Sequence, residues 1–172
     1  GEIITQVIER TEKEQDLKKV SLYLSILKKE NFELAVEKAV EIGVSEIIPI
    51  ITERTIKLNL NEDRVRKIIR EASEQSGRTI LPVLSPIMKF EDAIIDGTKN
   101  EEKIFFDLAE NENSKIIDYK SASIFIGPEG GFTKEEQDFA LQNDYKIESL
   151  GALTLRAETA AIIATYKVVN NL

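Results

Sequence analysis

SIFIGPEGGFTKEE, residues 123–136, is the stretch that indicates the architecture of this chain. Its first four residues form a short apolar run that is typical of a buried strand. Thr133 followed by Glu136 is a capping box, which predicts that a helix begins there. Three of the chain's eight glycines lie between these two elements, within five positions. A strand, a tight turn and a helix in this order predict one unit of an α/β fold.

The same alternation continues on both sides of this stretch. Upstream, apolar periodicity predicts helices over 32–42, 61–75 and 90–95 and near residue 114, with strands over 46–51 and 103–106. Gly43 follows the first of these helices, where a C-terminal cap belongs. Downstream, we expect a strand over 146–150 and a helix from residue 156. The chain is therefore predicted to be an α/β domain with a mostly parallel sheet.

The N-terminal residues are expected to belong to a different unit. Residues 2–9 and 19–27 carry alternating apolar positions and are predicted as two strands, joined by a charged turn over 10–16. Two strands cannot close a hydrophobic core by themselves. The chain is therefore expected to begin inside a domain whose earlier part is missing.

The composition of the 172 residues excludes several classes of function. The chain has no Cys and no His, which argues against thiolate metal sites, zinc enzymes and Ser-His-Asp hydrolases. No apolar run approaches the roughly 18 residues that a membrane-spanning helix needs. A formal net charge of −8 opposes non-specific binding to nucleic acid, so any RNA contact needs a local basic patch or a partner.

The glycine-rich turn has two interpretations. It is either only a tight turn before a helix cap, or a loop whose backbone passes close to a ligand at the carboxyl end of a strand. Amides at the start of the helix would favour an anion. The spacing matches neither G-x-G-x-x-G nor G-x-x-x-x-G-K-[ST], so the familiar nucleotide-phosphate loops lose support.

A second glycine turn lies in SLGALTLRAETAA, residues 149–161, where a helix follows the turn. Arg156 and Glu158 stand in its first turn. Glu158 can simply complement the helix dipole, with Arg156 paired to it or to solvent. Alternatively, both side chains face a ligand.

Together, GPEGGFTKEE and LGALTLRAETAA, with EKAVEIGVSEIIPIITERT (37–55) and EASEQSGR (71–78) upstream, resemble the RsmE-type methyltransferases of the SPOUT class. The resemblance covers residues 28–172 and implies a SPOUT methyltransferase domain there. It implies a mostly parallel sheet with helices on both faces and a C-terminal deep trefoil knot, an exception to the unknotted rule. It further implies transfer of a methyl group from S-adenosylmethionine to uridine N3 in small-subunit (16S) ribosomal RNA.

The resemblance also implies specific site residues. The cofactor is expected in the knot, against the backbone of two loops: Gly127, Glu129, Gly130 and Gly131 from the first, and Leu150, Gly151 and Leu155 from the second. Arg156 and Glu158 are the catalytic candidates, the former to stabilise charge on the uracil or clamp a phosphate, the latter as a base. Four polar residues at element ends are candidates for RNA binding: Arg54, Gln75, Ser76 and Arg78. No metal is expected.

Members of this family are homodimers that associate through the knot helices, and the implied setting is the cytoplasm, in ribosome biogenesis. Their N-terminal barrel, which resembles a PUA domain, has at most a remnant here in residues 1–27, so the chain is expected to be a fragment or a reduced relative. Leu153-Thr154 replaces an expected basic-aliphatic pair, and Ala157 replaces an expected Thr. Two other functions stay open: methylation of a tRNA nucleotide, and a non-catalytic module that binds adenosyl groups or RNA.

Overall fold

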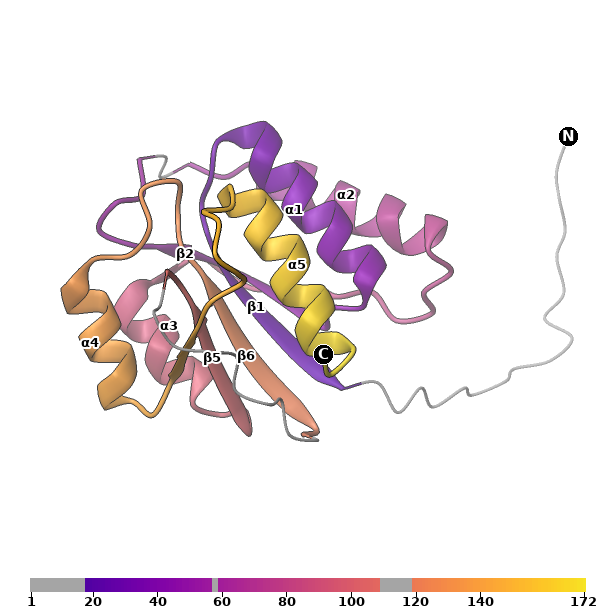
Figure 1. Cartoon of the computed structure of the whole chain (residues 1–172). Helices are drawn as coiled ribbons and strands as arrows, with labels where there is room; N and C mark the ends of the chain where they lie inside the picture. Colours follow the sequence, from indigo (N-terminus) through magenta and orange to yellow (C-terminus); the bar gives the residue numbers. More distant parts are fainter. Residues whose placement is uncertain (1–17, 57–58, 109–118) are drawn as a thin grey trace, which may run out of the picture.

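The computed structural model describes residues 18–56, 59–108 and 119–172, which form a sheet between two helical layers (Figure 1). The sheet has seven strands: β1 (Lys19–Ser25), β2 (Glu46–Ile51), β3 (Val83–Leu84), β4 (Met88–Lys89), β5 (Glu102–Phe106), β6 (Ser121–Ile126) and β7 (Lys146–Glu148). Its order is β3-β2-β1-β6-β5-β7, with β4 also beside β2. Every pair of neighbouring strands is parallel, which confirms the predicted α/β class.

Among the described residues, five helices cover the two faces of the sheet. One face carries α1 (Lys29–Ile42), α2 (Glu62–Gln75) and α5 (Ala157–Val169), and the other carries α3 (Phe90–Gly97) and α4 (Lys134–Gln142) (Figure 1). The core is accordingly split into two apolar clusters by the sheet. Along β1, Leu22 and Leu24 belong to the first cluster and Tyr23 to the second, and all three are fully buried. Alternate residues of a strand point to opposite faces, so a central parallel strand is apolar on both.

The expected boundary between residues 27 and 28 would assign residues 19–25 to the N-terminal unit, and that assignment is wrong. Strand β1 lies in the middle of the sheet, where it pairs with β2 on one side and β6 on the other. It is therefore the central strand of the α/β domain and no part of a separate barrel. The other strand predicted at the N-terminus, over residues 2–9, lies outside the described residues, as does the short helix near residue 114.

Local signals located most element ends correctly. The predicted capping box is present: the Thr133 side chain accepts from the backbone N–H of Glu136, whose carboxylate accepts from the backbone of Thr133. Gly43 ends α1 at φ 124° and donates its N–H to Ala39 O. The side chain of Asn61 caps α2 by accepting from the N–H of Arg64. Strands β3 and β4 were not predicted, because two residues each are too short to carry a periodic signal.

Helix α5 returns from the edge of the sheet to its centre. It follows β7, the outermost strand, and then packs against α1 over β1 and β6 (Figure 1). This path brings the start of α5 to the carboxyl ends of the central strands. The trefoil knot implied by the resemblance stays a prediction.

Candidate active site

A cavity of about 640 Å³ opens at the carboxyl ends of β5, β6 and β7. All strands point the same way, so their following loops meet at one edge of the sheet, where ligands of open α/β sheets bind. The walls come from the loops after β1, β5, β6 and β7 and from the first turn of α5. All nine residues predicted from the resemblance to bind the cofactor or act in catalysis line this cavity: Gly127, Glu129, Gly130, Gly131, Leu150, Gly151, Leu155, Arg156 and Glu158.

Glycine stands at three positions of the first loop for different structural reasons. A Cβ on Gly127 would lie 3.0 Å from two ring carbons of Phe132, so only glycine lets that ring pack there. A Cβ on Gly130 would lie 3.4 Å from the side chain of Arg54. Gly131 adopts φ 68° and donates its backbone N–H to Pro128 O at 2.9 Å, which closes a turn. A Cβ on Gly131 would enter open space. Packing against Phe132, contact with Arg54 and a left-handed backbone thus each account for one glycine of this run.

The second loop is held by its own serine. The Ser149 hydroxyl donates to the carbonyl of Gly151 at 3.0 Å and lies 3.3 Å from its amide nitrogen. Gly151 has φ 130°, which favours glycine, and a Cβ there would also meet nothing within 4 Å. Leu150 packs against the larger apolar cluster, whereas Leu153 is 80% exposed. This loop thus presents a glycine backbone and apolar side chains to the cavity.

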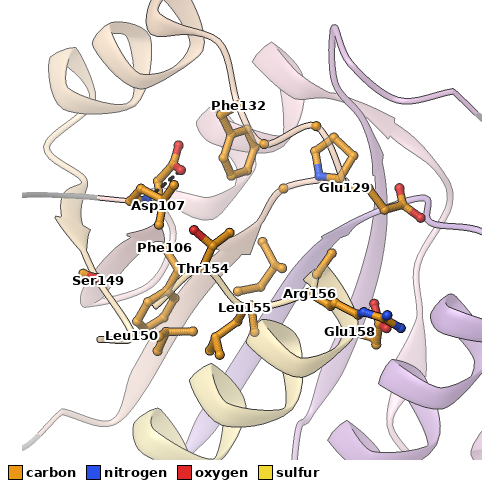
Figure 2. A pocket seen from close by; sticks show the side chains of 18 of the residues that line it. Phe106, Asp107, Glu129, Phe132, Ser149, Leu150, Thr154, Leu155, Arg156 and Glu158 are labelled. Atoms are coloured by element: carbon orange, nitrogen blue, oxygen red, sulfur yellow. Dashed lines mark hydrogen bonds between the residues drawn. The ribbon is translucent and has the colours of Figure 1, made fainter. Parts of the chain in front are cut away.

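The charged side chains gather at opposite ends of the cavity. Figure 2 shows Asp107 on one side and Glu129, Arg156 and Glu158 on the other, with Leu155 between them and with Phe106 and Leu150 below Asp107. Counting Lys28, the lining carries three carboxylates and two cationic groups. The site therefore suits an elongated ligand with an apolar middle and polar or cationic ends.

Glu158 is the most unusual of these groups. It lies in the first turn of α5, its exposed fraction is only 7%, and its Oε2 has no hydrogen-bond partner. A buried carboxylate oxygen without a partner is costly, so such a group in a cavity wall points to a ligand that donates to it. The helix dipole at this end of α5 favours the negative charge.

Arg156 precedes the helix as its N-cap residue, at φ −66° and ψ 151°. Its side chain is exposed. In the part of the chain that the structure describes, it forms no hydrogen bond or ion pair with any residue, and so none with Glu158. The two side chains nevertheless come from neighbouring backbone positions at one end of the cavity (Figure 2). Pairing of Arg156 with Glu158, one of the two interpretations of the sequence, is therefore not observed.

The glycine loop is tied to the start of α1 by Glu129. Its Oε1 accepts from the backbone N–H of Lys28 at 3.1 Å, although 101 positions separate the two residues. Lys28 and Asn31 consequently line the cavity as well. Sequence reasoning missed both, because the pairing of β1 with β6 and this bond join segments that are far apart in the chain.

The four residues predicted to bind RNA lie outside the cavity. Arg54 Nη1 donates to the carbonyls of Gly130 and Phe132, at 2.8 and 3.1 Å. Arg78 Nη1 donates to Val40 O at 2.9 Å near the end of α1, and burial lowers the pKa of its guanidinium. The Ser76 hydroxyl donates to Ala72 O at 2.6 Å. Gln75 lines a separate groove between α1 and α2, and the RNA-binding role of these residues stays a prediction.

Asp107 is a cavity residue that the sequence analysis did not single out. It directly follows β5, and its Oδ2 accepts from Gln137 Nε2 of α4 at 2.8 Å, which fixes the carboxylate at the rim. Its position was open to prediction, since it is the polar residue at the carboxyl end of a predicted strand. Within the described ranges, no cluster of His, Cys, Asp and Glu is placed to hold a metal ion. In the same ranges, every helix lacks the length and apolarity needed to cross a membrane.

The chain is similar to known proteins in sequence and in fold. The family model described as an RNA methyltransferase domain matches residues 13–169. Ribosomal RNA small subunit methyltransferase E of Rickettsia conorii is 33% identical over 156 residues, which cover 87% of this chain and 63% of that protein.

Two solved structures are also similar. A Legionella pneumophila protein in complex with S-adenosylmethionine is 30% identical, with a TM-score of 0.80 over 88% of this chain and 65% of that one. Ribosomal RNA small subunit methyltransferase E of Neisseria gonorrhoeae, bound to S-adenosylmethionine, is 29% identical, with a TM-score of 0.76 over 86% of this chain and 64% of that one. The chain thus spans less than two thirds of the length of these three proteins.

Proposed function

Because the chain belongs to the RNA methyltransferase family and is similar to its small-subunit type E members, we propose that it transfers a methyl group from S-adenosylmethionine to uridine N3 in small-subunit ribosomal RNA. The observation that carries the proposal is the buried Oε2 of Glu158, which lacks a partner in the wall of a cavity between two glycine loops.

The cavity fits the cofactor in size and chemistry. Its volume of about 640 Å³ lies within the usual range of ligand pockets, roughly 300–1,000 Å³. Gly131 and Gly151 leave open space where other residues would carry a side chain. Leu150 and Leu155 offer apolar contact to an adenine ring, and the excess of carboxylates complements a cationic sulfonium and ammonium. Seven residues would hold the cofactor: Gly127, Glu129, Gly130, Gly131, Leu150, Gly151 and Leu155.

The chemistry then depends on placement and proton removal. When bound, the cofactor supplies an electrophilic methyl group on a sulfonium, so no metal is required. The uracil N3–H must lose its proton as the bond from N3 to the methyl carbon forms and the bond from that carbon to sulfur breaks, with the thioether S-adenosylhomocysteine as the leaving group. Glu158, whose buried Oε2 has no hydrogen-bond partner, is the residue that we assign to accept that proton. The unpaired guanidinium of Arg156 is available to stabilise negative charge on the uracil oxygens or to hold a phosphate.

The proposed RNA partner conflicts with the charge of the chain, which is −8. We therefore infer that tight binding needs surfaces besides this domain. Independently of the RNA, Ile163 and Tyr166 of α5 are 40% and 53% exposed, so this helix has apolar area available for the proposed homodimer. The proposed setting is the cytoplasm, during ribosome biogenesis.

Calorimetric titration of the chain with S-adenosylmethionine tests the pocket directly. Saturable binding is expected, and its absence at millimolar cofactor would overturn the proposal. Incubation with unmethylated small subunits and labelled cofactor tests the reaction. Mass spectrometry of the digested RNA should find 3-methyluridine, whereas methylated tRNA, or binding without transfer, would support one of the two other functions.

A further inference from the structure

The loop after β2 reaches across to the glycine loop, and one arginine makes most of the contact. Arg54 Nη1 donates to Gly130 O at 2.8 Å and to Phe132 O at 3.1 Å. Its aliphatic part lies against Gly130, since a Cβ built there would be 3.4 Å from both Cβ and Cδ of Arg54. A Cβ at position 130 would thus be in van der Waals contact with this arginine.

These bonds hold a peptide unit that would otherwise turn easily. The unit between Gly130 and Gly131 has glycine on both sides, so its rotation meets little steric resistance. Here its carbonyl accepts from Arg54, and its N–H donates to Pro128 O at 2.9 Å. Both ends of the unit are therefore occupied, and its orientation toward the cavity is set.

A second link joins the same two loops. The carboxylate of Glu136, only 7% exposed, accepts from the backbone N–H of Glu53 at 2.9 Å with Oε1. Its Oε2 accepts from the N–H of Thr133 at 2.8 Å. The capping group of α4 thus also holds the residue next to Arg54, which keeps the arginine in reach of both carbonyls.

We propose that Arg54 is a positioning residue for the cofactor loop, which it acts on through the carbonyls of Gly130 and Phe132, and that it makes no RNA contact. The inference rests on the proposed function, because Gly130 and Gly131 line the proposed cofactor cavity. It replaces the RNA-binding role expected from the position of Arg54 at the end of a strand.

The test compares Arg54→Met with Arg78→Met. Methionine keeps an unbranched apolar side chain but has no donor. Arg78 is the matched control, since its Nη1 also donates to a backbone carbonyl, Val40 O at 2.9 Å, but outside the cavity wall. We expect both variants to lower the thermal unfolding midpoint. Only Arg54→Met should weaken S-adenosylmethionine binding, by about 10-fold as measured by calorimetry, the usual order for a lost charge-assisted bond.

Two further readouts separate positioning from general stability. Hydrogen exchange at the Gly131 amide should speed up in Arg54→Met and stay unchanged in Arg78→Met. In the methylation assay, Arg54→Met should raise KM for the cofactor with little change in kcat, and Arg54→Lys, which keeps one donor, should recover part of the loss. If Arg54→Met does not fold, Arg54→Lys carries the comparison by itself.

Some results would overturn the inference. One is unchanged cofactor affinity and unchanged exchange at Gly131 in Arg54→Met. Another is weaker RNA binding by Arg54→Met, together with a slope of log binding constant against log salt concentration that is smaller by about one unit, as expected for a lost phosphate contact. If the wild-type chain binds no cofactor, the proposed function fails, and hydrogen exchange still decides whether Arg54 holds the loop.

Discussion

Substituting Gly131 by alanine should separate its role in the fold from its role in the cavity, because the chain contains a matched glycine elsewhere. Gly131 has φ 68° and Gly77 has φ 72°, and a Cβ on either would meet no atom within 4 Å. The two positions therefore impose the same backbone strain on alanine without a clash. They differ in location: Gly131 lines the cavity, and Gly77 follows the end of α2.

The expected loss of stability is similar for both variants. Left-handed backbone costs a non-glycine residue about 1–2 kcal/mol. Alanine also restricts the unfolded chain, which offsets about 0.4–1 kcal/mol. The net destabilisation is roughly 1 kcal/mol, and a domain of this size loses about 2–4 °C in unfolding midpoint for each kcal/mol. Cofactor affinity should differ: a methyl group in space that the ligand occupies should cost Gly131→Ala about 10-fold or more, which corresponds to about 1.4 kcal/mol.

Thermal unfolding without cofactor and calorimetric titration with S-adenosylmethionine measure the two effects separately. The reasoning predicts equal shifts in midpoint for Gly131→Ala and Gly77→Ala, with weaker binding in the former alone. Equal cofactor affinity for Gly131→Ala and the wild type would refute the idea that a ligand approaches this part of the loop. A fall in affinity for Gly77→Ala of the same size would show that binding follows overall stability instead of local space.

Three further outcomes are expected. Glu158→Gln keeps the shape of the side chain but weakens its proton acceptor, so single-turnover methyl transfer at saturating cofactor should fall about 10²–10⁴-fold while cofactor affinity changes little; unchanged transfer would remove this residue from proton abstraction. Gly127→Ala places a Cβ 3.0 Å from two carbons of a buried ring, and the overpacking should destabilise the chain by about 1–3 kcal/mol in urea unfolding, so wild-type stability would contradict the packing argument. Burial alone would raise the pKa of Asp96, but hydrogen bonds from Tyr23 and Lys99 lower it below its usual value near 3.8. The carboxylate therefore stabilises the fold above about pH 4, and this contribution is lost as the pH falls through the lower, folded-state pKa. The unfolding free energy of Asp96→Asn should depend less on pH in that acidic range, and a pH profile like that of the wild type would contradict this role of Asp96.

The helix boundaries were largely predictable because their signals are local. The capping box at Thr133 and the C-terminal glycine at position 43 depend on backbone groups within a few residues, and both are present as expected. Strand β2 has the predicted bounds, since a continuous apolar run of six residues suits a strand buried on both faces. The two glycine loops were also predictable as neighbours, because loops that follow parallel strands share one edge of the sheet.

The place of β1 was not predictable from such signals. Its residues alternate in hydrophobicity well enough to suit a barrel hairpin, yet they pair with residues 46–50 and 121–126, which are far away in the chain. Periodicity indicates that a segment is a strand but carries no information about its partners. The role of Arg54 was hidden for the same reason, since its carbonyl acceptors are 76 and 78 positions away.

By itself, then, the sequence determined the α/β class, the helix caps and the two glycine turns, because each depends on interactions among residues close in the chain. Only the tertiary structure decided which strand is central, which arginine holds the glycine loop, and which carboxylate of the cavity wall has a buried oxygen without a partner. These depend on contacts between distant segments, and such contacts are selected by the packing of the whole sheet and its helices.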